Sequence, residues 1–297
     1  SHSGDLVFTQ PIESSGGSIE LAAASIRSTG QFKANSTLEI TAYNSIQLAN
    51  TLLAPGGIAV IAPDLTVGGD GSSILAESLQ NALLSTDVLL SANNQTEGFW
   101  NVVFNSPIVW NSNHFFAVGA AHSITVNAPI TVSGGGVLSF TANIVSDPHG
   151  NFTYGQYGSG GIIAINAPIT VSGDDNFILL NATPLSGVSE SGVIFGAGGR
   201  LDFSSRYNVL RINDQVYDLI DRLSDLDQLD GDLASSVNVG SINNLTGNYA
   251  LMQNIDASDA VYYRALINPS ANQSFSGRFE GLGHTISHLT IDSTVLG

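Results

Sequence analysis

The sequence predicts an all-β protein built from stacked β-coils, a β-solenoid. The octapeptide Asn-Ala-Pro-Ile-Thr-Val-Ser-Gly occurs at 127–134 and again 39 residues later at 166–173. A second pattern, apolar-x-apolar-x-Ala, recurs with the two-residue period of a strand. The composition is 43% hydrophobic but only 11% charged, with 32 glycines. Repetition without a helical period points to coils that bury their apolar sides by stacking on one another.

The apolar-x-apolar-x-Ala pattern marks the strands that we expect to form the coils. It fits at 19–23, 38–42, 58–62, 88–92, 124–128, 138–142, 163–167 and 178–182. The first three starts are 19 and 20 residues apart, and later ones pair at 39 and 40. We therefore expect coils of about 20 residues, with 39 residues as two coils. Ile19 to Phe203 then form one solenoid of about nine coils, about 45 Å long.

Glycine clusters follow several of these strands and predict tight turns. They lie at Gly68–Gly71, Gly134–Gly136 and Gly173–Asp175. Turns of this kind need positive φ, which glycine adopts without a steric penalty.

Charge and composition exclude several classes of function. Eight basic residues against 25 acidic ones give a net charge of −17, and Lys33 is the only lysine. We therefore expect no binding to nucleic acid or to an anionic membrane surface. The sequence has no run of 18 apolar residues and no signal-peptide pattern at Ser1, so we expect no membrane insertion.

The absence of cysteine removes disulfides, thiol catalysis and cysteine-ligated metal together. In an extracellular protein, this composition suits bacterial export in an unfolded state better than a small disulfide-stapled fold.

A different pattern begins near Arg206 and predicts one short helical insertion. The apolar positions of this segment have helical spacing, and aspartates lie between them. These apolar residues are Val216, Leu219, Ile220, Leu223 and Leu226. We therefore divide the chain into β-coils over 1–205, a helical connector over 206–236 and a further β-unit over 237–297.

The last unit contains the most specific motif of the chain. Gly247–Leu251 reads Gly-Asn-Tyr-Ala-Leu, and Asn254–Ser258 reads Asn-Ile-Asp-Ala-Ser. Phe275–Ser287 reads Phe-Ser-Gly-Arg-Phe-Glu-Gly-Leu-Gly-His-Thr-Ile-Ser. Together they resemble the GLUG-type repeat of filamentous-haemagglutinin-like adhesins, which are exported by two-partner secretion. Residues 81–92 and 124–130 are similar to the coil repeats of the same family.

This resemblance implies a right-handed parallel β-helix in a large adhesin at the surface of a Gram-negative bacterium. The implied partners are an outer-membrane transporter and a glycan or protein receptor on a cell surface or in a matrix. The family's Asn-Pro-Asn secretion signature and a C-terminal anchor are not found, so we expect this chain to belong to a longer parent. The resemblance does not name the receptor.

Two polar clusters are candidate metal sites. His284 and His288 have the four-residue spacing of a zinc pair on a helix, but the glycines before them disfavour a helix, so a structural histidine at a turn is the preferred interpretation. The carboxylates of Asp225, Asp227, Asp230 and Asp232 surround Gly231 without matching a calcium loop. A solvated acidic helix face ending at glycine is preferred there, with weak calcium binding left open.

An aromatic group and six Asn-x-Ser/Thr triplets complete the candidates. The aromatic residues are Phe99, Trp100, Phe104, Trp110, Phe115 and Phe116. Their alternation favours core packing over a sugar-stacking platform, with Phe99 or Phe115 left as possible exposed rings. The triplets begin at Asn35, Asn94, Asn151, Asn181, Asn244 and Asn272. Several such triplets are expected by chance in a chain so rich in Asn, Ser and Thr.

The main rival is a polysaccharide-processing β-helix enzyme. Its candidate groups are Asp174–Asp175, Arg211–Asn213 and Gly283–His284, but no basic residue lies between Lys33 and Arg200. A lyase acting on anionic glycans needs a basic clamp and a base, so we expect no catalytic residue, no metal and no cofactor. A self-associating extracellular filament subunit is the third alternative.

The Gly281–Gly283 segment predicts a tight turn between two coils. We expect both glycines to be required by the turn, with Phe279 and Ile286 anchoring it to the core on either side.

Overall fold

The computed structural model describes residues 4–93, 100–146, 152–154, 161–182, 192–227, 229, 245–259, 261–263, 265–267 and 274–292. Within these ranges the chain is mostly β-strand, with two helices, α1 (Ala76–Leu83) and α2 (Leu223–Asp227). Most strand pairs are parallel. The predicted all-β class is therefore confirmed.

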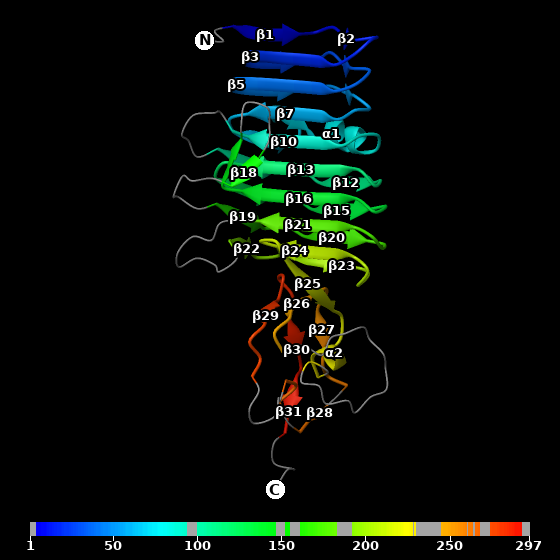
Figure 1. Ribbon diagram of the computed structural model, residues 1–297, viewed down its shortest axis with the longest axis vertical. Coiled ribbons are helices and arrows are strands. Elements are labelled where there is room, and N and C mark those ends of the chain that lie inside the picture. The colour runs from blue at the N-terminus through cyan, green and yellow to red at the C-terminus, as the bar shows by residue number, and fades with distance from the viewer. Residues whose placement is uncertain are drawn as a thin grey trace.

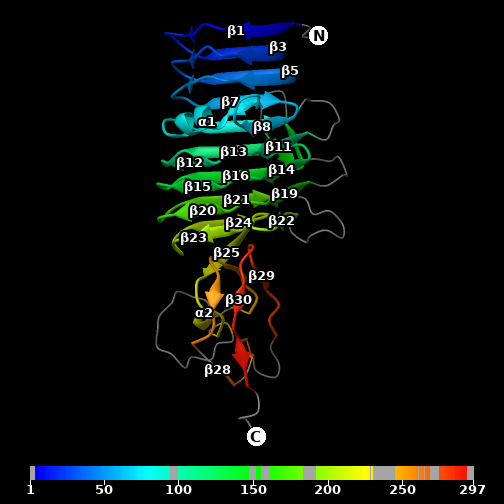
Figure 2. The same cartoon turned by 180° about the vertical axis from the view of Figure 1, so that it is seen from behind.

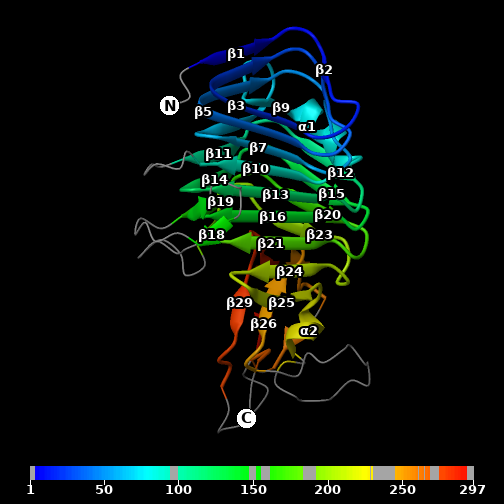
Figure 3. The ribbon, with the colours of Figure 1, turned by 45° about the horizontal axis from the view of Figure 1, so that its top comes forward.

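Except for one antiparallel pair, the strands between residues 5 and 212 stack in three columns, which Figure 1 shows from the side and Figure 3 with the top tilted forward. The first column holds residues 19–23 of β3 (Ile19–Ser28), residues 38–42 of β5 (Leu38–Leu48), β7 (Ile58–Ala62), β10 (Val88–Ala92), β13 (Phe115–Ala120), β16 (Val137–Ala142), β21 (Phe177–Asn181) and β24 (Val209–Ile212).

The second column begins with β1. The long strands β3 and β5 contribute their first halves to the first column and their second halves to this one. It holds β1 (Asp5–Phe8), residues 25–28 of β3, residues 45–48 of β5, β9 (Ile74–Leu75), β8 (Leu65–Gly68), β11 (Asn101–Phe104), β14 (Ser123–Val126), β19 (Ile162–Ile165) and β22 (Val193–Phe195).

The third column contains a helix in place of one strand. It holds β2 (Ile12–Glu13), β4 (Phe32–Lys33) and β6 (Leu52–Leu53), then α1, then β12 (Ile108–Asn111), β15 (Ile130–Ser133), β20 (Ile169–Ser172) and β23 (Leu201–Phe203). Helix α1 packs against both β6 and β12. Its buried side chains, including Leu79 and Leu83, face the common core, so a helix of eight residues closes the gap that a strand fills elsewhere.

The core lies between the three columns. All residues of the apolar-x-apolar-x-Ala pattern are buried except Leu21, which is partly buried and packs against the same core. Equivalent positions of the pattern pair with one another on neighbouring strands, with Leu38 opposite Ile58 and Ile58 opposite Val88. Because alternate residues of a strand face opposite sides, each coil buries its apolar face against its neighbours.

The expected coil length is wrong in the repeat region. Ile124 pairs directly with Ile163, and Leu138 pairs directly with Ile178, so 39 or 40 residues form one coil rather than two. The extra length includes the antiparallel strands β17 (Ile144–Ser146) and β18 (Phe152–Tyr154), which leave the coil between β16 and β19. Seven coils, rather than nine, therefore lie between the starts of β3 and β24.

The prediction of a helix in the 206–236 connector is also largely wrong. Residues 209–220 form β24 and β25 (Gln215–Ile220), which pair as an antiparallel hairpin. Its turn is Asn213–Asp214, with φ values of 49° and 61°. Two successive residues at positive φ make a hairpin turn whose twist matches the strands, and Asn and Asp tolerate it. Helix follows only at Leu223–Asp227 among the described residues of this segment.

The remaining strands form a second unit beyond the hairpin. They are β26 (Asn248–Leu251), β27 (Ile255–Asp256), β28 (Val261–Tyr262), β29 (Arg278–Glu280), β30 (Ile286–Ser287) and β31 (Thr290–Ile291). Parallel pairs join β25 to β26, β26 to β29, β27 to β30 and β28 to β31. In Figures 1 and 2 these strands run along the long axis, across the direction of the strands that form the columns.

The second unit covers the last coil of the columns. The backbone N–H of Leu201 donates to the carbonyl of Leu282 at 3.0 Å, and the N–H of Phe203 donates to the carbonyl of Met252 at 3.0 Å. Leu282 and Met252 belong to the core of the columns, being 2% and 4% exposed. The outer edge of β23 is thus satisfied by carbonyls of the second unit.

The Gly281–Gly283 turn differs from its prediction in two respects. Gly283 has φ of 84°, whereas Gly281 is not at positive φ, so the conformation requires glycine at one position. Phe279 is 39% exposed and Ile286 is partly buried. The anchor is Leu282, between the glycines, because outward-pointing Phe279 lies on an open face of β29.

Candidate functional site

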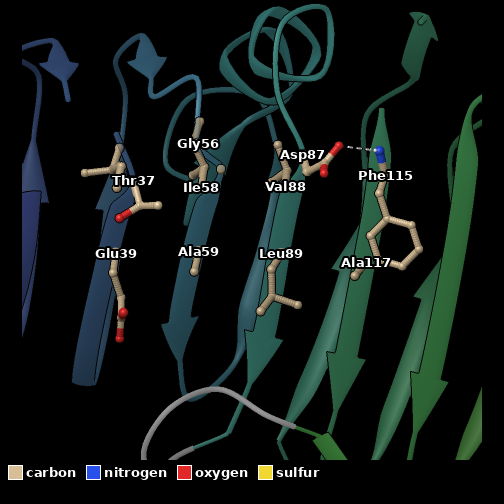
Figure 4. Close-up of a pocket in the computed structure, with 12 residues that line it drawn as sticks. Thr37, Glu39, Gly56, Ile58, Ala59, Asp87, Val88, Leu89, Phe115 and Ala117 are labelled. Carbon is tan, nitrogen blue, oxygen red and sulfur yellow. Dashed lines mark hydrogen bonds between the residues drawn. The ribbon is translucent and has the colours of Figure 1, made fainter. Parts of the chain in front are cut away.

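A groove crosses the outer face of the first column. It spans four successive strands, β5, β7, β10 and β13, and has a volume of about 520 Å³. It is lined by Thr37, Leu38, Glu39, Gly56, Gly57, Ile58, Ala59, Asp87, Val88, Leu89, Phe115 and Ala117. Figure 4 shows these residues as neighbours across the strands.

Small residues create the floor of the groove. Gly57 and Ala59 lie in the β7 coil, and Ala59 is in register with Glu39 on one side and Leu89 on the other. Because outward positions alternate along a strand, Glu39, Ala59 and Leu89 project from the same face. Because the Ala59 side chain is only a methyl group, a hollow remains between the longer side chains of Glu39 and Leu89.

Asp87 fixes the far wall of the groove. Its Oδ1 accepts a hydrogen bond from the backbone N–H of Phe115 at 2.9 Å and lies 3.1 Å from Nδ1 of His114. The Phe115 side chain is 37% exposed and lies beside the groove in Figure 4. The Asp87 carboxylate thus fixes the start of β13, and with it the position of the Phe115 ring.

The groove is acidic and apolar at once. Glu39 and Asp87 carry its carboxylates, and among the described lining residues none is basic. The strands of the two carboxylates, β5 and β10, are two spacings apart, about 10 Å, and Asp87 is also offset from Glu39 by two residues along the strand direction. Among the described residues Glu39 has no hydrogen-bond or ion-pair partner, so its carboxylate is available.

An apolar row continues from the groove along the first column. We call it the outer ladder: Phe115, Val137, Phe177 and Val209, which are in direct register on four successive strands. Phe177 is 41% exposed, and both valines are partly exposed. Contiguous exposed apolar side chains of this kind are typical of interaction surfaces.

A second, polar hollow lies where the two units meet. Its volume is about 430 Å³, and it is lined by Phe195, Gly196, Gly198, Gly199, Arg200, Asn254, Gly283, His284 and Thr285. The Arg200 guanidinium is occupied by Asp202, with Nε 2.8 Å from Oδ2. His284 is buried, with Nε2 2.9 Å from the carbonyl of Leu201. The His284 contact joins the two units, whereas the Arg200–Asp202 pair lies within the columns.

The histidine candidates are placed apart in different environments. His284 is a buried residue at a turn, as the preferred interpretation expected. His288 is exposed at φ of 58°, with Nδ1 2.9 Å from Oδ1 of Asp256. The described residues contain no group of three or more His, Asp or Glu side chains arranged to hold a metal.

One of the acidic candidates, Asp225, lies in an ion network rather than on a solvated helix face. Asp225 is fully buried, and its Oδ2 lies 2.8 Å from Nη2 of Arg206 while its Oδ1 lies 3.2 Å from Nε of Arg222. Nη2 of Arg206 also lies 2.6 Å from Oδ1 of Asp221. Burial lowers the pKa of Arg206, but Asp225 and Asp221 outweigh it and raise that pKa above its ordinary value. Asp230, Gly231 and Asp232 lie outside the described residues.

Most of the aromatic group is core, as predicted. Phe104, Trp110 and Phe116 are buried, with the Trp110 and Phe116 ring centroids 5.8 Å apart. Trp100 is partly buried against the same core. Phe115 is the exposed ring, and Phe99 lies outside the described residues.

The groups weighed for an enzyme are not brought into one groove. Asp174 and Asp175 follow the end of β20, whereas His284 lies at the start of β23, the strand paired with β20. They therefore lie at opposite ends of two neighbouring strands of the third column. Arg211 lies on the exposed face of β24 in the first column.

Two of the six Asn-x-Ser/Thr triplets have described asparagines. Asn35 is exposed and donates from Nδ2 to the carbonyl of Ser15 at 2.8 Å, and Asn181 is partly exposed on β21. The asparagines at 94, 151, 244 and 272 lie outside the described residues.

Comparisons of the chain with protein-family models, curated proteins and solved structures give no match. Among the described residues, neither helix has the length and apolar character needed to cross a bilayer. The groove residues other than Phe115 were missed by the sequence analysis. Their signal is an alternation of small and acidic residues on outward positions, which becomes visible only once the coils are in register.

Proposed function

We propose that this chain is a structural and adhesive segment of a large exported bacterial adhesin, folded as a right-handed parallel β-helix. The observation that carries the proposal is the stack of three parallel columns around one core. Such a stack is a rigid extended support, and each coil contacts only its neighbours. It presents a continuous outer face on which the groove and the outer ladder lie side by side.

The surface chemistry supports the same proposal. Asparagines at equivalent positions of successive coils hydrogen bond to each other, as in Asn105, Asn127 and Asn166. Such ladders satisfy exposed polar side chains without charge. The resemblance of residues 237–291 to the GLUG-type repeat supports an extracellular location and an outer-membrane transporter as a partner of the parent protein.

Surface exposure in the source bacterium tests the proposal. Antibodies raised against the purified chain should label intact, unpermeabilised cells, and external protease should remove the label. Beads coated with the folded chain should attach to cells or matrix more than beads coated with urea-unfolded chain. Labelling that requires permeabilisation would contradict the adhesin proposal.

Two assays separate the alternatives. Depolymerisation of acidic polysaccharides by the pure chain, abolished by a single Asp or His substitution, would favour the enzyme. Concentration-dependent growth in light scattering, with fibres in electron micrographs, would favour a filament subunit.

A further inference from the structure

We propose that the groove on the first column binds a lysine or arginine side chain of a protein partner, whose neighbouring apolar residues lie on the outer ladder. This inference rests on the proposed function, because it assigns a chemical class to the receptor of an adhesive segment.

Hydrogen-bond chemistry is the first argument. Among the described lining residues, the polar side chains are Thr37, Glu39 and Asp87. The Thr37 hydroxyl already donates to Oγ of Ser18 at 2.7 Å, and both carboxylates accept only. The groove therefore offers acceptors without free side-chain donors. Lysine and arginine are the complement, because their side chains carry donors and no acceptor.

Shape is the second argument. Gly57 and Ala59 form the floor, with Glu39 on one side and Leu89, Asp87 and the Phe115 ring on the other. A lysine or arginine lays its methylene stem along apolar surface while its charged head meets a carboxylate. The face of an exposed phenylalanine adds an attraction for the same cation.

Charge and continuity are the third argument. The chain has a net charge of −17, which favours a cationic partner over an anionic one. Phe115 belongs both to the groove and to the outer ladder. A partner that places a cation in the groove therefore meets apolar side chains on the next three strands. A neutral glycan fits less well, since its hydroxyls require donors as well as acceptors.

The first experiment uses the whole chain and a pentapeptide, acetyl-Lys-Leu-Lys-Leu-Lys-amide, in surface plasmon resonance at low salt. Its controls are acetyl-Glu-Leu-Glu-Leu-Glu-amide and maltohexaose. We expect binding of the lysine peptide alone, with affinity that falls as salt is added.

Variants locate the binding. Glu39→Gln keeps the shape of the wall and removes its charge, so the Kd for the lysine peptide should rise about threefold to fivefold. Ala59→Ile fills the floor with a good strand former and should raise the Kd more than about tenfold. Glu20→Gln is the matched control, because Glu20 is in register with Glu39 one strand outside the groove. It should change the Kd less than about twofold.

Three results would overturn the proposal. Equal effects of Glu39→Gln and Glu20→Gln on the Kd would mean that the lysine peptide is attracted by the overall negative charge of the chain and not by the groove. Equal binding of the glutamate peptide would remove the need for a cation. Binding of maltohexaose that Ala59→Ile blocks, with the lysine peptide unaffected, would assign the groove to a glycan. Failure of surface labelling would contradict the adhesin proposal and leave these peptide results standing, so the two can fail separately.

Discussion

Asn166 donates a hydrogen bond from Nδ2 to Oδ1 of Asn127 at 2.9 Å, and these two residues are the first members of the repeated octapeptide. Asn127 in turn donates to Oδ1 of Asn105 at 3.1 Å. Ile130 is opposite Ile169, so the two copies of the octapeptide lie directly on one another. The repetition in the sequence is thus a repetition of one coil position, and its side chains bind their own equivalents.

Asn176→Ala tests the buried counterpart of this ladder. Asn176 is fully buried, and its Oδ1 accepts from the N–H of Gly136 at 3.1 Å while its Nδ2 donates to Oδ1 of Asn208 at 2.9 Å. Loss of these partners leaves buried polar groups unsatisfied, so we expect a loss of about 2–4 kcal/mol in urea unfolding. Asn127→Ala, on the exposed ladder, should lose about 0.5–1.5 kcal/mol. Equal losses would contradict a special role for burial.

Gly283→Ala tests the turn against the last coil. Gly283 is at φ of 84°, and an added Cβ would lie 2.8 Å from Cα of Arg200. Backbone strain alone should lower the unfolding free energy by about 1–3 kcal/mol, and the clash adds to it. Gly281→Ala is the control, because its Cβ would have no neighbour nearer than 3.6 Å. A thermal midpoint unchanged by Gly283→Ala would argue against this contact between the units.

Asp225→Ala tests the buried ion network. Removing this fully buried carboxylate leaves Arg206 and Arg222 with Asp221 as their remaining partner, and we expect a loss of about 3–5 kcal/mol. Arg200→Gln breaks a pair whose arginine side chain is 42% exposed, and should change stability by at most about 1 kcal/mol. Chemical denaturation of both variants measures the difference. A small effect of Asp225→Ala would mean that the network is not needed for folding.

The Asp256–His288 contact predicts a pH dependence. The hydrogen bond from His288, followed by those from Ser258, lowers the pKa of Asp256 below its ordinary value of 3.8. A carboxyl with a lowered pKa in the folded state stabilises above the unfolded pKa, and that stability is lost as the pH falls through the folded pKa. From about pH 5 to about pH 2, urea midpoints should therefore fall more in the wild type than in Asp256→Asn. Parallel curves would show that the contact has no effect on folding.

The core could be predicted from the sequence because a two-residue period identifies inward positions directly. Ile124 and Ile163 were expected in one column and are paired there. The number of coils could not be predicted, since a coil can extend outward, as between β16 and β19, without changing the register of its core. Period alone counts residues between equivalent positions, and an outgrowth adds residues without adding a coil.

The prediction of helices from the sequence has a different limit. The apolar positions near Leu219 fit a helical period, but the turn chemistry of Asn213–Asp214 determines the hairpin. Ala76–Leu83 contains Leu79, Ala82 and Leu83 at helical spacing, a signal that was overlooked. The groove could not be read from the sequence, because Ala59 and Leu89 are neighbours only after a 30-residue coil closes.

The carbonyls of Leu282 and Met252 on the edge of β23 also determine how copies of this chain can associate. The hairpin of β24 and β25 likewise occupies the last strand of the first column. These contacts occupy the outer edges of β23 and β24, which end the third and first columns. A strand of a second copy would find these edges already paired, so the molecule cannot add strands edge to edge at this end of the two columns.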